Sequence, residues 1–214
     1  MVTAKRAYAG VSAEERRAQR CAALLGAALE IAGNRGFAKL TVRAVCRESG
    51  LTERYFYENF PDMDALVNAV FDDMVTDLSA RILDGVAAAP KQTRAKMRAG
   101  VAAAVVTLTD DPRRLRMFTE AEFNPVLAAR RSELVSDFAA VVLSVRRQHY
   151  GPDAILRMGP RGRFAAMHVV GGLYETMIGW TRGDLAVSRE ELIELATDML
   201  AVVGDYLERG NTGP

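Results

Sequence analysis

The 214-residue chain has few of the residues from which catalytic and metal sites are built. It has only two histidines, His149 and His168, and two cysteines, Cys21 and Cys46, with no His or Cys near either cysteine. Sequence motifs of serine hydrolases, zinc proteases, dithiol enzymes and phosphate-binding loops are also missing. We therefore expect no enzyme, no cofactor and no metal, with buried reduced thiols. Spatial clustering of residues distant in sequence is the remaining alternative.

Long apolar runs are missing too. No stretch is long enough to span a bilayer, and the N-terminus lacks the apolar segment of a signal peptide. This predicts a cytoplasmic protein with no membrane partner. Half of the residues are nevertheless hydrophobic, which is enough to bury a core in one compact unit or in two closely joined small domains.

Charge is unevenly distributed along the chain. Residues 1–60 contain 10 basic and 6 acidic residues, a net charge of +4, whereas residues 61–214 contain 18 basic and 21 acidic residues, a net charge of −3. The two segments add up to the overall net charge of +1. A basic N-terminal segment suits a polyanionic partner, but so small an excess is equally typical of a solvated surface.

The N-terminal third begins with helix signals. Residues 1–11 have no sustained apolar period and are expected to form a flexible arm. Ser12 and Glu15 have the spacing of a capping box, and apolar residues then recur at helical intervals as far as Gly33. This pattern predicts a first helix over about residues 13–33, ended by Gly36.

Two short helices are expected next, separated by a glycine turn. Thr41 is an N-cap candidate for a helix over about 42–49, which stops where Gly50 can take the left-handed backbone conformation. Leu51 then supplies a buried contact, and Thr52 caps a third helix. In that helix Phe56 and Phe60 are expected to face inward.

The remaining chain also shows helical patterns. Asp62 opens a fourth helix that ends before Pro90, with an apolar stripe at Leu66, Val70, Met74, Leu78 and Ile82. The last two helices are expected over about 161–182 and 189–208, the latter with a capping box from Ser188 to Glu191. The fold class is thus all-α with about nine helices, divided into an N-terminal domain over 12–60 and a C-terminal domain over 61–210.

Two short helices joined by a glycine turn are the layout of a helix-turn-helix, whose second helix enters the major groove of DNA. Arg54 and Tyr55 on the third helix are placed to meet base edges, whereas Arg43 and Arg47 on the second helix are placed to hold phosphates. Thr52 is expected to contact the DNA backbone while it caps its helix. A helical hairpin that only packs, with its tyrosines half-buried, is the alternative.

Here the sequence resembles the TetR family of bacterial regulators. The resemblance covers about residues 20–70 and is carried by Gly36-x4-Thr41-Val42-Arg43-x-Val45, Ser49-Gly50-Leu51-Thr52 and Tyr57-x2-Phe60-Pro61-x2-Asp64-x-Leu66. It implies phosphate contacts at Thr41, Arg43, Thr52 and Tyr57, and base or groove contacts around Glu53, Arg54 and Tyr55.

Three positions qualify this resemblance. Asn59 stands where a phosphate-contacting histidine is common, and Met63 stands where the family usually has a lysine that touches the DNA backbone. Glu53 in a first helical turn is explained by the helix dipole without any DNA.

The resemblance also implies a homodimer, formed through the last two helices, that binds a nearly palindromic double-stranded operator. The expected interface residues are Gly171, Gly172, Leu192, Leu195, Met199 and Val203. Two glycines inside an apolar helix either admit the backbone of a partner or relieve crowding within the same chain.

A small hydrophobic or amphipathic inducer is expected inside the C-terminal domain, where its binding would shift the fourth helix and release the DNA. The preferred lining residues are Met117, Phe118, His168, Tyr174, Met177 and Trp180, with Met97, Phe123, Phe138 and Met167 as further candidates. Residues of these types are also ordinary core residues. The function predicted is that of a ligand-responsive repressor, and a helical adaptor that binds protein is the rival reading.

Overall fold

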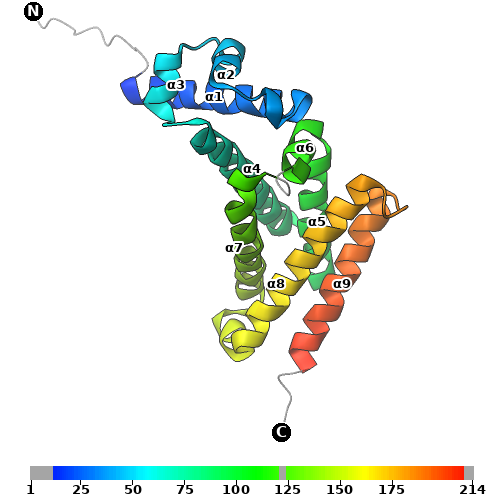
Figure 1. The fold of residues 1–214 in the computed structure, drawn as a ribbon. Helices are drawn as coiled ribbons and strands as arrows, with labels where there is room; N and C mark the ends of the chain where they lie inside the picture. Colours follow the sequence, from blue (N-terminus) through cyan, green and yellow to red (C-terminus); the bar gives the residue numbers. More distant parts are fainter. Residues whose placement is uncertain (1–11, 121–123, 210–214) are drawn as a thin grey trace, which may run out of the picture. The chain divides into compact units, whose positions relative to one another are not determined.

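The computed structural model describes residues 12–120 and 124–209, and these residues fold entirely into helices and connecting turns (Figure 1). The all-α prediction is therefore confirmed, whereas the expected arm at 1–11 and the candidate Phe123 lie outside the described residues. The elements are α1 (Ala13–Arg35), the 3-10 turn η1 (Phe37–Lys39), α2 (Val42–Ser49), α3 (Glu53–Asn59), α4 (Met63–Ala88), α5 (Thr93–Thr109), α6 (Pro112–Glu120), α7 (Pro125–Tyr150), α8 (Pro152–Arg182) and α9 (Arg189–Arg209).

The chain forms two compact units that divide within α4, between Val70 and Phe71. This division falls later than the domain boundary expected after residue 60. The first turns of α4 bury Leu66 and Val67 and belong by their contacts to the N-terminal unit. The beginning of the long fourth helix is therefore part of the small domain.

The N-terminal unit is organised around α1, which contacts η1, α2 and α3. The predicted capping box is present: Glu15 N donates to Ser12 Oγ at 3.0 Å, and Ser12 N donates to a Glu15 carboxylate oxygen at 2.6 Å. At the other end Gly36 has a φ of 82°, a backbone conformation that favours glycine. The core of this unit is formed by Leu24, Ala27, Ala28, Ile31, Ala32, Val45, Cys46, Phe56, Phe60, Leu66, Val67 and Val70.

The C-terminal unit is a bundle of long helices in which α7 packs on α8, α9 packs on α5 and α8, and α6 packs on α5 (Figure 1). Ion pairs join α5 to α9: Arg94 lies 3.0 Å from Glu194 and 2.6 Å from Asp198. Arg130 of α7 pairs with Asp72 of α4. Because such pairs are partly exposed, each contributes about 0–1 kcal/mol, and the apolar contacts between the helices supply most of the stability.

The two last helices follow their sequence signals. The Gly159-Pro160 signal appears as a kink inside α8, where Gly159 has φ 51° and ψ −140° and Pro160 lacks an N–H donor. The capping box of α9 is present, since Glu191 N donates to Ser188 Oγ at 3.2 Å and Ser188 N donates to Glu191 at 2.8 Å. Within 12–120 and 124–209, no helix is long and apolar enough to cross a membrane.

Candidate functional site

The turn between α2 and α3 has the geometry that the sequence predicts. Gly50 adopts the left-handed conformation, with φ 69° and ψ 18°, at the end of α2. Leu51 N then donates to Cys46 O at 3.0 Å, which closes the end of α2. Phe56 is fully buried and Phe60 nearly so, as expected. These two rings fix which face of α3 points away from the core.

Exposed cations lie on α2 and α3. The side chain of Arg43 is 92% exposed and lies 3.7 Å from a Glu53 carboxylate oxygen, and that of Arg54 is 84% exposed and donates to Glu58 at 3.0 Å. Arg47 is exposed as well. Ion pairs this exposed are weak and screened by salt, so these guanidinium groups can exchange a carboxylate partner for a phosphate or a base edge.

The two predicted cap residues behave differently. Thr41 accepts a hydrogen bond from Ala44 N at 3.2 Å through its hydroxyl oxygen, and its own O–H can still donate outward. Thr52 has extended backbone at the start of α3, but its side chain makes no cap hydrogen bond. The expectation that Thr52 caps while it contacts DNA is therefore wrong in its first part. The exposed Thr52 hydroxyl is not engaged in capping α3.

Tyr55 is held by a residue that the sequence reasoning missed. The guanidinium of Arg20, on α1, lies 4.7 Å from the centre of the Tyr55 ring, within cation–π range. Arg20 is four residues before the buried Leu24, so it lies on the face of α1 that points toward the core. That spacing is the signal that would have found it.

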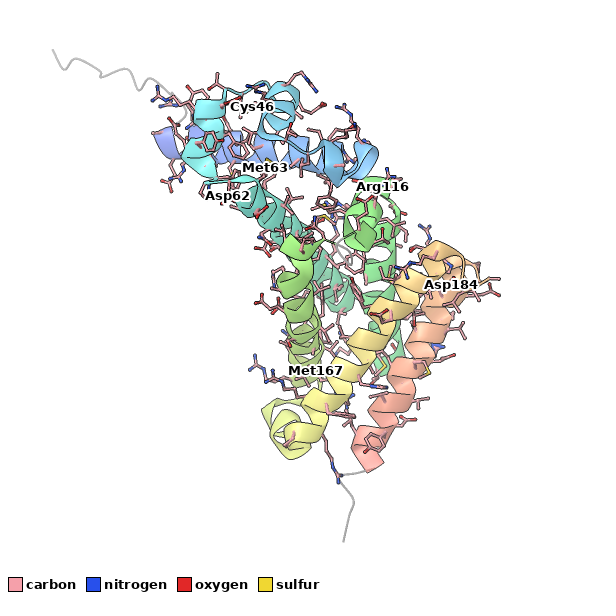
Figure 2. All side chains as sticks on the ribbon, in the orientation of Figure 1. Cys46, Asp62, Met63, Arg116, Met167 and Asp184 are labelled. Carbon is pink, nitrogen blue, oxygen red and sulfur yellow. The ribbon has the colours of Figure 1, made fainter. Side chains whose placement is uncertain are left out.

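The remaining predicted contacts are at the end of α3 and the start of α4. Tyr57 is 56% exposed and packs edge-on against Phe56, with ring centres 5.2 Å apart. Asn59 Nδ2 donates to Tyr55 O at 2.7 Å, which orients the amide. Asp62 accepts from Ala65 N at 2.8 Å and so caps α4, whose first residue, Met63, is half-buried (Figure 2). An uncharged thioether in this position cannot pair with a phosphate.

A second candidate site is a cavity of about 190 Å³ inside the C-terminal unit, lined from α4, α5, α6, α7, α8 and α9. Phe118, Tyr174 and Met177 line it, as do Met97 and Phe138. The other predicted residues lie elsewhere: Met117 is packed in the core, and Trp180 Nε1 donates to Val187 O at 2.8 Å. The sequence reasoning missed two cations in the lining, Lys96 and Arg146.

His168 does not point into this cavity but is exposed on α8, where its ring stacks on that of Phe164 with centres 6.1 Å apart. Met167, another candidate for the cavity, is exposed on the same helix (Figure 2). The sequence places these residues on an apolar helix but does not tell which side of it faces the cavity.

An exposed apolar face runs along α9. Leu195, Met199, Val202 and Tyr206 are each more than half exposed and recur at helical spacing. Of the residues predicted for the interface, Leu195 and Met199 belong to this face, whereas Leu192 is buried within the chain and Val203 lines the cavity. The predicted stripe therefore combined two faces of α9.

The glycines of α8 do not relieve crowding among the described residues. A Cβ added to Gly171 would meet Val135 at an ordinary contact distance of 3.9 Å, and one added to Gly172 would have no described atom within 4 Å. Crowding by the described residues of the same chain therefore does not explain Gly171 and Gly172. Phe164, which is 71% exposed, lies two turns before Gly171 on the same helix.

Two short helices, a left-handed glycine turn and an exposed basic face make the N-terminal unit a helix-turn-helix DNA-binding domain. Residues 24–70 match the model of the family described as bacterial regulatory proteins, tetR family. This match confirms the resemblance of the N-terminal unit to the DNA-binding domain of TetR-family transcription regulators.

Solved structures support the fold over most of the chain. A transcriptional regulator from Pseudomonas aeruginosa PAO1 has a TM-score of 0.67 at 17% identity, covering 92% of this chain and 99% of that chain. A TetR-family regulator from Mesorhizobium loti MAFF303099 has a TM-score of 0.64 at 16% identity, covering 88% and 96%. The fatty acid degradation regulator FadR from Bacillus halodurans has a TM-score of 0.61 at 14% identity, covering 85% and 94%. No curated protein matches the sequence.

Proposed function

We propose that this regulator is a cytoplasmic repressor that binds a nearly palindromic operator as a homodimer and is released by a small hydrophobic or amphipathic inducer. The observation that carries the proposal is the outward face of α2 and α3, where Arg43 and Arg54 are almost fully exposed beside a turn of helix-turn-helix geometry. Guanidinium groups in these positions are accessible to phosphates and base edges.

The proposed DNA contacts fall into two kinds. Arg54 and Tyr55, with Glu53 beside them, meet base edges, where an arginine can bind guanine through two hydrogen bonds and a carboxylate can accept from cytosine. Phosphates are bound by the residues around them, which fix register without reading sequence. These are Thr41, Arg43, Arg47, Thr52, Tyr57 and Asn59.

The exposed apolar face of α9, together with the neighbouring helix α8, supports a homodimer. An apolar face of this kind on a regulator is best explained by burial against a second copy. On α8 the exposed Phe164 and the open space at Gly172 allow the partner's backbone to approach. A two-fold dimer would present two recognition helices to two half-sites of a palindrome.

Release by ligand follows from the position of α4. Its C-terminal half lines the cavity through Leu78, Ile82 and Val86, and its first turns belong to the DNA-binding unit. A ligand that shifts α4 would change the spacing of the two recognition helices, which must remain about 34–36 Å apart to enter successive major grooves. A tenfold loss of DNA affinity needs only about 1.4 kcal/mol of differential binding.

Selection from a pool of random duplexes, sequenced after binding at two salt concentrations, tests the proposal. We expect a nearly palindromic sequence to be enriched by the wild-type protein, and the enrichment to be lost for Arg54→Ala. Arg147→Ala, which removes the same charge from an exposed position at the end of α7, is the matched control and should behave as wild type. Salt-sensitive binding without enrichment would contradict the proposal and favour an adaptor.

Sedimentation tests the dimer separately. Met199→Glu places a charge on the exposed face of α9 and should give a monomer. Leu83→Glu changes an exposed apolar residue of α4 and should leave the dimer intact. Monomeric wild-type protein would contradict this part of the proposal.

A further inference from the structure

The cavity of the C-terminal unit has an uneven chemical lining. Its polar side chains are those of Thr93, Lys96, Arg146 and Tyr174, and the other lining residues are Gly, Ala, Val, Leu, Ile, Met or Phe. Two of the four polar side chains are cationic, and no Asp or Glu is among the described residues that line the cavity. A site of this kind selects a ligand by the sign of its charge.

Both cations belong to one end of the cavity. Lys96 Nζ donates to Val86 O, in the last turn of α4, at 3.0 Å. An ammonium has three N–H donors, so Lys96 can offer further hydrogen bonds to a ligand. Arg146 lies close to α9. A Cβ added to Gly204 of α9 would be 3.4 Å from the Arg146 guanidinium and 3.4 Å from the side chain of Met97, the residue after Lys96. The first turns of α5 and the last turns of α4, α7 and α9 therefore meet around these two cations.

The opposite end is aromatic. The rings of Phe118 and Tyr174 lie with centres 4.8 Å apart, and Met177 follows one turn later on α8. α8 follows α7 after Gly151 and packs back along it (Figure 1). Tyr174 is late in α8 and Arg146 is late in α7, so the two residues belong to opposite ends of this helix pair. Lining residues on α7 extend from Leu134 to Arg146, about 18 Å of helix at 1.5 Å per residue. The cavity thus has an apolar length and a basic end.

Size and charge together limit the ligand. A cavity of about 150 Å³ holds one benzene ring, and this one is larger, at about 190 Å³. A positive charge beside apolar walls is poorly hydrated, and an anion brought to it forms short, charge-assisted hydrogen bonds. A cationic ligand would instead meet charges of its own sign.

We propose that the ligand is an amphipathic organic anion, a carboxylate with a medium-length apolar tail, whose head is bound by Arg146 and Lys96 and whose tail extends toward Phe118 and Tyr174. This inference rests on the ligand-sensing part of the proposed function. It adds the charge of the ligand, its orientation and the two residues that select it.

Calorimetric titration of the full-length protein with octanoate, octanol and octylammonium tests the charge directly, because the three probes have the same tail. Octanoate should bind at least about tenfold more tightly than octanol, the difference expected for one charged hydrogen-bonded contact, and octylammonium should bind least tightly. Equal affinities for octanoate and octanol, tighter binding of octylammonium, or no binding of octanoate would each overturn the proposal.

Variants locate the head group. Arg146→Met and Lys96→Met should each weaken octanoate binding about tenfold and leave octanol binding unchanged. Arg147→Met and Lys91→Met are the matched controls, since both residues are exposed and absent from the lining. If all four variants bind octanoate equally, the assignment of the head group is overturned. Helical circular dichroism and the melting temperature verify that each variant is folded.

A parallel titration with the selected operator duplex separates this proposal from the proposed function. Charge-selective binding of octanoate that leaves operator affinity unchanged would support the ligand assignment and contradict the sensor role. Intact operator binding together with octanol bound as tightly as octanoate would overturn the ligand assignment alone.

Discussion

The candidate DNA-binding residues of the N-terminal unit and the cavity-lining residues of the C-terminal unit face in opposite directions, outward and inward. In the N-terminal unit the functional candidates point outward, with Arg43 and Arg54 almost fully in solvent. In the C-terminal unit the residues that line the cavity point inward, and Tyr174 and Met177 are 8% and 3% exposed. Under the proposed function this difference follows from the size of each binding partner, because DNA is read from outside, whereas a small ligand is bound most strongly when water is excluded.

The units also differ in how they are packed. The core of the N-terminal unit is built around one ring, Phe56, which contacts Tyr57 and Phe60. The C-terminal unit leaves a cavity between six helices. Removing a fully buried ring from the small core should therefore cost more stability than removing a half-buried ring that borders the cavity.

The largest expected effect is the loss of stability when a core ring is removed from either unit. Phe56→Ala should destabilise the N-terminal unit by about 3–5 kcal/mol and abolish DNA binding, because the ring is fully buried. Phe138→Ala, beside the cavity and half-buried, should cost less than about 3 kcal/mol. Thermal unfolding followed by circular dichroism measures both. An equal or larger loss for Phe138→Ala would contradict the difference in packing.

The next largest effect is the loss of DNA affinity when an arginine of the outward face of α2 and α3 is removed. Arg54→Ala should cost about 1–3 kcal/mol of operator affinity and relax specificity at one base position. Arg43→Ala should weaken binding to every duplex alike and reduce the salt slope by about 1. Fluorescence anisotropy with the selected operator and a shuffled duplex measures both. If Arg54→Ala weakened binding to the operator and to the shuffled duplex equally, the proposal that Arg54 reads a base would be contradicted.

A smaller effect is expected when a glycine of either unit is replaced by alanine, because the two glycines have different backbone conformations. Gly50→Ala should destabilise by about 1–2 kcal/mol, because φ is 69° at this position and an L side chain is strained there. Gly172→Ala lies in helical backbone with open space around it, so it should stabilise the isolated fold by up to about 1 kcal/mol. Under the proposed function it should also weaken the dimer. Chemical denaturation and sedimentation check the two effects.

The smallest expected effect is the pH dependence of stability that Asp111 contributes. Hydrogen bonds from the Arg113 side chain, opposed by burial, hold the pKa of Asp111 below its ordinary value of about 3.9. A lowered pKa in the folded state stabilises the protein above the unfolded value and ceases to do so as pH falls through the folded value. Asp111→Asn should therefore destabilise by no more than about 1 kcal/mol at pH 7 and by less at pH 3. Melting temperatures at the two pH values measure this, and a larger loss at pH 3 would reverse the sign.

Local signals predicted the local structure well. The capping boxes at Ser12 and Ser188, and the turn at Gly50, each depend on residues within a few positions of one another. For the same reason the limits of α2, and the inward positions of Phe56 and Phe60, were confirmed.

What could not be predicted depends on contacts between helices. A helix that is apolar on two faces does not tell which face meets a cavity and which meets solvent, and so Val203 and Met199 were assigned to one stripe. The cation–π contact of Arg20 with Tyr55 joins distant residues in the same way. The cavity cations Lys96 and Arg146 resembled ordinary surface residues in the sequence.

The most direct test of the central claim is the ratio of affinities of the wild-type protein for the selected operator and for a shuffled duplex of the same length, measured at one physiological salt concentration. A regulator that reads sequence through α3 should bind the operator at least about 1,000-fold more tightly. Equal affinities for the two duplexes would contradict sequence-specific reading by this domain.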